Sequence, residues 1–199
     1  MKNQIMVQAS KQFIEGDVLH WWHEETGKGI RTRFSDDLLW LCYVVYEYIN
    51  HTGDYSILEK KMPYVYGKEL EEGIDERYDK YPKSDVEESI YMHCIRALER
   101  SLDFGENGLP KIGSGDWNDG LNTVGNKNKG ESIWLGFFLY DILNKFIYIC
   151  EFKNELERAK KYEKIKEELK RALNTAGWDG RWFKRAYTDD GHPIRKHRK

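Results

Sequence analysis

Residues 38–50 read LLWLCYVVYEYIN, and this stretch decides the fold that the sequence predicts. Apolar side chains occupy nearly every position around a 3.6-residue period, which is typical of a helix buried on several sides. Ser35 is the expected N-cap, and Asp36 and Asp37 in the first turn would complement the helix dipole. Residues 131–150 are also apolar nearly all round, so we expect a second helix of this kind.

More amphipathic helices are expected elsewhere in the chain. Residues 155–174 place apolar side chains on one face and a Lys/Glu run on the other, which we interpret as a solvated face. Residues 84–104 also have one apolar face, and Ser84 with Glu87 makes a capping box at their start. Residues 3–15 predict a short helix. The periodic segments are therefore all helical.

The fold class predicted from this pattern is all-α. Helices that are apolar nearly all round would line the inside of a layered helical toroid, and the amphipathic helices would form its outer ring. So few helices cannot close a toroid, which leaves either a bundle with oversized loops or an incomplete part of a larger barrel. We assign residues 1–194 to one domain and residues 195–199 to a basic tail.

Composition excludes several functions. The 32 Lys and Arg residues against 34 Asp and Glu give a net charge of −2, so there is no electrostatic basis for nucleic-acid binding. Cys42, Cys94 and Cys150 lie far apart without metal-ligand spacing, which predicts reduced thiols in a cytoplasmic protein and no metal. No run of about 18 continuous apolar residues is present, so we expect no direct membrane contact.

Long polar loops separate the expected helices. Aromatic residues reach 14% of the chain, and several lie in such loops, which favours a carbohydrate or another flat ligand. Residues 17–37 combine loop composition with polar groups that could form a site. Residues 62–83 are predicted to be irregular, and a loop of that length is commonly a lid or binding loop. His93, beside the apolar face of a predicted helix, is interpreted as a packed or interfacial residue and not as a catalytic one.

The chemistry concentrates in residues 113–122, which read GSGDWNDGLN. The carboxylates Asp116 and Asp119, the carboxamide Asn118 and the indole Trp117 lie within four residues, between glycines that allow sharp turns. A carboxylate can act as acid, base or acceptor, an amide recognises hydroxyl groups, and an indole face can stack on a pyranose. Asp, Asn and Gly also make ordinary surface turns, so the string alone fits both a turn and a sugar site.

Four stretches together resemble glycoside hydrolase family 94, which contains cellobiose, cellodextrin and chitobiose phosphorylases. They are residues 15–23, EGDVLHWWH; 26–37, TGKGIRTRFSDD; 115–120, GDWNDG; and 130–136, GESIWLG. The resemblance covers nearly the whole chain, and it is greatest to the phosphorylase-like domain of cyclic β-1,2-glucan synthases and to β-1,2-oligoglucan phosphorylases. It implies a partial (α/α)6 barrel in this chain, with the six-hairpin glycosidase type of architecture.

The resemblance implies inverting phosphorolysis of a β-linked glucooligosaccharide, most plausibly β-1,2-linked. Inorganic phosphate is then the co-substrate, and no cofactor is needed. Phosphate is already an anionic nucleophile, so a single general acid suffices where an inverting hydrolase needs two carboxyl groups. Asp119 corresponds to that acid, and burial or a nearby carboxylate such as Asp116 should raise its pKa.

The resemblance also implies which residues bind the sugar. Trp117 corresponds to an aromatic neighbour in the sugar site, and Arg31 and Asp37 correspond to residues that hold the sugar beside the bond being broken. The candidates placed by neighbourhood alone are Arg33, Asp36, His23, Asn118 and Asp116. The phosphate ligands of the family lie outside the matched stretches. We therefore expect a fragment that is inactive alone, from a parent that is a homodimer or part of a larger synthase.

Two other functions stay open. An inverting hydrolase on the same barrel would need a second carboxylate as base, and the long loop offers Glu69, Glu71, Glu72 and Asp75. Phosphate dependence of sugar release separates that enzyme from a phosphorylase. A non-catalytic carbohydrate-binding module would keep the Trp and Arg contacts, and its sugar binding would not change in Asp119→Asn.

Overall fold

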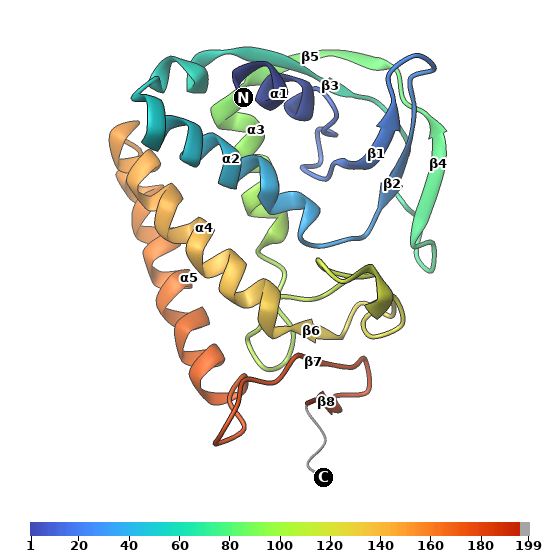
Figure 1. Cartoon of the computed structure of the whole chain (residues 1–199), viewed down its shortest axis with the longest axis vertical. Helices are drawn as coiled ribbons and strands as arrows, with labels where there is room; N and C mark the ends of the chain where they lie inside the picture. Colours follow the sequence, from blue (N-terminus) through green and yellow to red (C-terminus); the bar gives the residue numbers. More distant parts are fainter. Residues whose placement is uncertain (196–199) are drawn as a thin grey trace. The chain divides into compact units, whose positions relative to one another are not determined.

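The computed structural model describes residues 1–195, and the chain divides into two compact units, Met1–Ser101 and Leu102–Lys199 (Figure 1). Residues 196–199, which hold most of the predicted basic tail, lie outside the described residues. The assignment of residues 1–194 to one domain and 195–199 to a tail stays a prediction.

The expectation of an all-α fold with a partial (α/α)6 barrel is wrong. Residues 1–195 are 43% helix and 23% strand and contain three antiparallel sheets, so the class of this part of the chain is mixed α and β. The strands are only 2 to 7 residues long, so they lack the sustained alternation that reveals a strand in sequence. β4, for example, reads ERYDK and is largely exposed. Pairing with distant segments, not local pattern, makes these residues strands.

The first unit combines helices with two small sheets. Its elements in chain order are α1 (Lys2–Ala9), β1 (Leu19–His23), β2 (Lys28–Thr32), α2 (Asp37–Thr52), the 3₁₀ helix η1 (Tyr55–Glu59), β3 (Lys61–Val65), β4 (Glu76–Lys80), β5 (Lys83–Ser89) and α3 (Ile90–Ser101). One sheet has the order β1-β2-β4, and the other pairs β3 with β5. Both sheets are antiparallel.

α2 is the apolar helix expected from the sequence, and it packs on α1 and α3. Leu39, Cys42 and Val45 are completely buried. The helix ends where Gly53 takes a left-handed conformation, with φ of 67°. Its N-cap is Asp36, so the assignment of that position to Ser35 is wrong. The interpretation of a helix buried on several sides is confirmed.

Two predicted helices are shorter than expected. Residues 83–89 form β5 against β3, so the capping box at Ser84 is wrong, and α3 begins only at Ile90. Ser89 Oγ instead accepts the backbone N–H of Met92 at 3.2 Å. α1 ends at Ala9 because the following residues leave the helix to form isolated bridges, such as Gln12 with Val18.

His93 on α3 is fully buried, as the packing interpretation predicted. Its ring stacks on Tyr64 with centroids 4.1 Å apart, and its nitrogens lie 2.6 Å from Gln12 Oε1 and 3.0 Å from the carbonyl oxygen of Met62. Burial lowers the pKa of His93, against the opposing effect of the Met62 carbonyl. The residue belongs to the core of the first unit.

The second unit is built on a helical hairpin. Its elements are the 3₁₀ helix η2 (Asp119–Leu121), β6 (Glu131–Ser132), α4 (Ile133–Phe152), α5 (Leu156–Thr175), β7 (Ala186–Tyr187) and β8 (Pro193–Ile194). α4 and α5 lie side by side along their length (Figure 1). A Cβ added at Gly136 would lie 2.9 Å from Leu173 Cδ2, so glycine allows the close approach of the two helices. Both helices agree with the sequence prediction.

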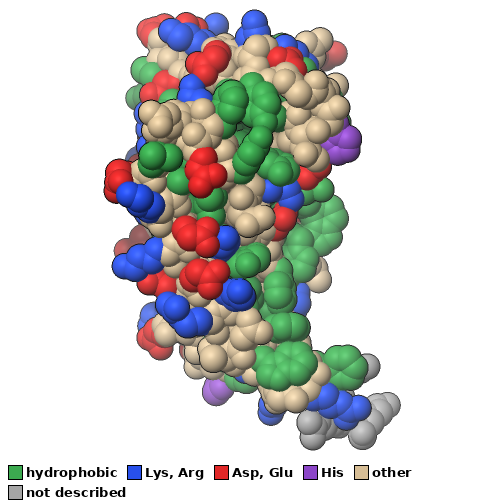
Figure 2. Space-filling model, turned by 90° about the vertical axis from the view of Figure 1, so that its left-hand side faces the viewer, with side chains coloured by type: hydrophobic (Ala, Val, Ile, Leu, Met, Phe, Trp, Pro, Cys, Tyr) green, Lys and Arg blue, Asp and Glu red, His purple; other side chains and the backbone are tan. Residues whose placement is uncertain are grey.

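α5 carries the predicted solvated face. Lys160 bonds Glu157 and Lys170 pairs with Glu167, each three positions apart on the helix. Figure 2 shows Lys and Arg side chains interleaved with Asp and Glu on the face that it draws, without a large patch of either sign. Such exposed pairs contribute little to stability.

α4 is long and apolar enough to cross a membrane by length and composition, although Asp141 and Lys145 interrupt its apolar run. Half of its most apolar stretch is buried inside the protein, and core helices of soluble proteins can have the same length and composition. One such helix is weak support for a membrane span. The absence of direct membrane contact stays a prediction.

Candidate functional site

Asp116 fixes the base of the loop of residues 113–122 and is fully buried. Its carboxylate accepts two hydrogen bonds from the Arg185 guanidinium, at 2.8 Å from Nη1 and 2.5 Å from Nη2. Ser132 Oγ donates to it at 2.5 Å and the backbone N–H of Asn118 at 3.1 Å. Burial acts to raise the pKa of Asp116, but these donors outweigh burial and hold the pKa below its usual range. Asp116 is therefore an ionised carboxylate that ties the loop to the start of α4.

The tip of the same loop is exposed. Trp117 keeps 65% of its surface open to solvent, and Asn118, Asp119 and Gly120 are also exposed. Asn118 Oδ1 accepts the backbone N–H of Gly120 at 3.1 Å, which shapes the short helix η2 that begins at Asp119. The expected burial of Asp119 is not observed, and the neighbouring carboxylate Asp116 is occupied by Arg185. The loop thus presents an indole and a carboxylate from a rigid base.

Asp189 organises the neighbouring loop that precedes β6. Its carboxylate accepts the backbone N–H groups of Lys127, Lys129 and Gly130 at distances of 2.9 to 3.0 Å. Burial acts to raise the pKa of Asp189, but the three N–H groups lower it overall. Its own backbone N–H donates to the carbonyl of Val124 at 2.9 Å. A carboxylate from the β7–β8 turn therefore holds this glycine-rich loop in place.

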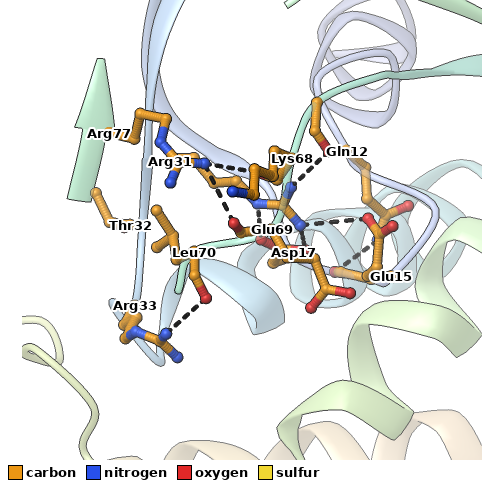
Figure 3. Close-up of polar contacts among 12 residues, drawn as sticks. Gln12, Glu15, Asp17, Arg31, Thr32, Arg33, Lys68, Glu69, Leu70 and Arg77 are labelled. Carbon is orange, nitrogen blue, oxygen red and sulfur yellow. Dashed lines mark hydrogen bonds and ion pairs between the residues drawn. The ribbon is translucent and has the colours of Figure 1, made fainter. Parts of the chain in front are cut away.

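Arg31, on β2 in the first unit, is fully buried and engaged within the protein (Figure 3). Its Nε and Nη2 donate to the two oxygens of Asp17 at 2.6 and 2.8 Å, and Nη2 also donates to Glu15 at 3.2 Å. The guanidinium lies 3.7 Å from the centre of the Phe13 ring, and Nη1 donates to the Gly67 carbonyl at 3.2 Å. Burial acts to lower the pKa of Arg31, and the carboxylates raise it overall. Its observed contacts are those of a buried ion pair.

Arg33 and Arg77 extend these contacts along the segment between β3 and β4. Together with Arg31 they donate to a run of backbone carbonyl oxygens, and we call these three arginines the carbonyl clamp. Arg33 donates to the carbonyls of Leu70, Glu71 and Ile74, and Arg77 donates to those of Lys68 and Glu69. Figure 3 shows Arg31, Arg33 and Arg77 around Lys68, Glu69 and Leu70 of this segment. Residues 67–74 have no strand partner, so guanidinium groups satisfy backbone acceptors that a sheet would otherwise bind.

The carbonyl clamp predicts the behaviour of the segment. We expect Arg77→Gln to speed cleavage of the folded chain after Glu69, Glu71 or Glu72 by a Glu-specific protease about tenfold, because two charge-assisted hydrogen bonds are lost. Arg100→Gln is the matched control, since Arg100 forms an ion pair with the exposed carboxylate of Glu69, at 3.7 Å, which should contribute little. Equal cleavage rates in the two variants would contradict the clamp. The rates are measured by mass spectrometry of the released peptides.

Asp36 and Asp37 point in different directions, as expected for adjacent residues. Asp37 Oδ2 lies 2.8 Å from His20 Nδ1 and 3.5 Å from Thr32 Oγ1, so Asp37 faces the sheet. Asp36 accepts the indole N–H of Trp40 at 2.9 Å and so belongs to the helix. His20 in turn stacks on Phe34, with ring centroids 4.8 Å apart. Asp37 is therefore held in one orientation at the end of β2.

Comparison with known proteins identifies the family. Residues 1–199 match the family model described as the catalytic domain of the glycosyl hydrolase 94 superfamily. The chain belongs to this family. It is 43% identical over 192 residues to cyclic beta-(1,2)-glucan synthase NdvB from Rhizobium meliloti (strain 1021), covering 96% of this chain and 7% of that protein.

Further family members are phosphorylases. Solabiose phosphorylase from Paenibacillus borealis is 33% identical, covering 82% of this chain and 19% of that protein. N,N'-diacetylchitobiose phosphorylase from Vibrio furnissii is 28% identical, covering 86% of this chain and 19% of that protein. The chain thus spans at most about a fifth of the length of these relatives. Membership confirms the resemblance seen in the motifs.

The family motifs fall in separate units of the chain. Arg31, Arg33, Asp36, Asp37 and His23 lie in the first unit, and the residues of the GDWNDG loop lie in the second. His23 is exposed on β1, with its ring edge-on to Trp21 at 5.3 Å. Their union in one sugar site, and the role of each, stay predictions.

Several residues that hold the site had no predicted role. Glu15, Asp17, His20 and Ser132 lie inside the family motifs, so their position was a usable signal. Arg185 and Asp189 lie in a stretch without periodicity, and only the tertiary structure brings them to the loops. Within residues 1–195, no group of three or more His, Cys, Asp or Glu side chains could hold a metal ion.

Proposed function

We propose that the whole protein containing this chain is an inverting glycoside phosphorylase acting on β-linked, most plausibly β-1,2-linked, glucooligosaccharides. Family membership supports the class, and the relatives named as glucan synthase and phosphorylases support a glycan substrate. The observation that carries the proposal is the GDWNDG loop. Asp116 locks its base, so Trp117 and Asp119 are presented together at a tip whose backbone is fixed.

Asp119 is the proposed general acid. Inorganic phosphate attacks the anomeric carbon, the glycosidic bond breaks, and its electron pair goes to the glycosidic oxygen, which takes the proton from the Asp119 carboxyl group. The products are a sugar 1-phosphate of inverted configuration and the shortened acceptor. Solvent then returns a proton to Asp119. No cofactor takes part in the step.

Asp37 is the proposed sugar ligand of the first unit. Its carboxylate is held by His20 at 2.8 Å and remains partly exposed, which leaves acceptor capacity for a sugar hydroxyl. The guanidinium N–H groups of Arg31 donate to carboxylates and to a backbone carbonyl, and those of Arg33 donate to backbone carbonyls. We therefore propose that these arginines serve the site by fixing the surrounding chain.

The test is sugar 1-phosphate release from a β-1,2-linked glucooligosaccharide by the whole protein, with and without phosphate. Asp119→Asn is expected to lower the rate about 10²- to 10⁴-fold, which is the range for loss of general acid catalysis. Asp190→Asn, an exposed carboxylate of the same unit, is the matched control and should leave the rate unchanged. The chain by itself is assayed in parallel, and we expect little or no release from it.

Other outcomes would favour the alternatives. Phosphate-independent release of free sugar would contradict phosphorolysis and favour a hydrolase. Oligosaccharide binding that is the same in Asp119→Asn, without turnover in the whole protein, would favour a binding module.

A further inference from the structure

An aromatic row on α4 lies against the Trp117 indole. The rings of Trp117 and Trp134 have centroids 6.4 Å apart and planes inclined by only 26°. Trp134 also contacts Phe138, with centroids 5.7 Å apart. Positions 134 and 138 share one face of the helix because they lie four residues apart. The exposed indole at the loop tip is thus one end of a continuous aromatic row.

Two successive loop residues are attached to the beginning of α4. The carboxylate of Asp116 accepts from Ser132 Oγ, which also caps the helix by accepting the backbone N–H of Leu135 at 2.9 Å. The next side chain, Trp117, lies on Trp134 in the first turn of the same helix. The hydrogen bond between Ser132 and Asp116 fixes where the loop starts, and the contact between the two indole rings fixes the direction of the Trp117 indole. Neither contact alone would hold both.

The near-parallel contact also relates the plane of the Trp117 indole to α4. The centroid separation and the small angle between the two ring planes are typical of offset stacking. The side chain nevertheless keeps 65% of its surface exposed. A flat ligand can therefore use the exposed part of the indole, whose plane is tied to α4 through Trp134.

We propose that Trp134 is a positioning residue that orients the Trp117 indole so that a pyranose stacks on the solvent-exposed part of that indole, beside Asp119. This inference rests on the proposed function for the sugar contact, and on ring geometry alone for the support of Trp117. The helix thereby sets the plane of the sugar relative to the acid. Trp134 itself touches neither the sugar nor the reacting atoms.

The first measurement needs no sugar. The indole N–H signal of Trp117 is assigned in the full chain by its loss in Trp117→Phe and is then compared across variants by ¹⁵N–¹H NMR. In Trp134→Ala we expect this signal to shift and to gain mobility, since the ring current and the support are both removed. Trp134→Phe should restore most of the wild-type signal, and it keeps the test valid if the alanine variant does not fold.

The matched control is Phe137→Ala. Phe137 lies on the same helix but contacts Phe183 edge-on, with centroids 4.8 Å apart, so its removal should leave the Trp117 signal unchanged. An unchanged Trp117 signal in Trp134→Ala, or an equal change in Phe137→Ala, overturns the inference.

The second measurement titrates the same samples with a linear β-1,2-linked glucooligosaccharide. We expect the Kd to rise about threefold to tenfold in Trp134→Ala, as for the loss of one aromatic pair, and to recover largely in Trp134→Phe. A Kd that is unchanged in Trp134→Ala overturns the role in sugar orientation. A wild-type chain that does not respond to the sugar, while Trp134→Ala still releases Trp117, supports the positioning of Trp117 and overturns its role in sugar orientation in this chain. The proposed function is tested separately, by sugar 1-phosphate release from the whole protein.

Discussion

Replacing Arg31 by methionine is expected to lower the free energy of unfolding by about 3–5 kcal/mol, as for removal of one partner from a buried ion pair. The guanidinium is fully buried, and its loss leaves the carboxylates of Asp17 and Glu15 without their cation. It also leaves the Gly67 carbonyl without a donor. Methionine keeps much of the apolar part of the arginine side chain. The loss of unfolding free energy therefore measures the charged contacts more than the packing.

Urea unfolding followed by circular dichroism measures this effect. Arg100→Met is the matched control, because that arginine is exposed and should change stability by less than about 1 kcal/mol. Adding Asp17→Asn to Arg31→Met should recover part of the loss, since the unpaired charge is removed with its partner. Unchanged stability in Arg31→Met, combined with weaker oligosaccharide binding, would favour the sugar contact implied by the family over the buried ion pair.

Replacing Asp116 by asparagine is expected to cost about 2–4 kcal/mol at pH 7, because Arg185 and Ser132 lose a buried charged acceptor. Arg185 is partly exposed and can regain water, which places this loss below that of Arg31. The loop base would loosen, so the whole protein should also lose phosphorolysis activity although Asp119 is intact. Ser132→Ala removes one of the same hydrogen bonds and should cost less.

The effect of Asp116 depends on pH in a defined direction. Its folded-state pKa lies below the ordinary value for Asp, about 3.9, so its carboxylate contributes stability above that value. The contribution is lost as the pH falls through the folded-state pKa. The difference in unfolding free energy between wild type and Asp116→Asn should therefore shrink below about pH 4. A difference that stays constant from pH 7 to pH 3 would contradict the ionised pair.

The sequence by itself determined the helices with strong apolar patterns and the family. α2, α4 and α5 were predictable because a long amphipathic or buried helix repeats its pattern over many residues. The family was recognisable from residues 15–37 and 115–136, because each motif is a run of neighbouring residues that can be read directly from the sequence. The motif GDWNDG also identified Trp117 and Asp119 as candidate site residues.

Only the tertiary structure decided the sheets and the supports of the site. β2 pairs with β4 across a long separation in sequence, and this pairing places Arg77 opposite Arg31, two like charges that the carboxylates and backbone carbonyls accommodate. Arg185 reaches Asp116 from 69 positions away. Such contacts depend on pairing and burial between distant segments. Stretches this short carry no periodic signal from which their pairing could be predicted. For that reason the sequence predicted which residues form the loop tip, and the structure revealed what holds it.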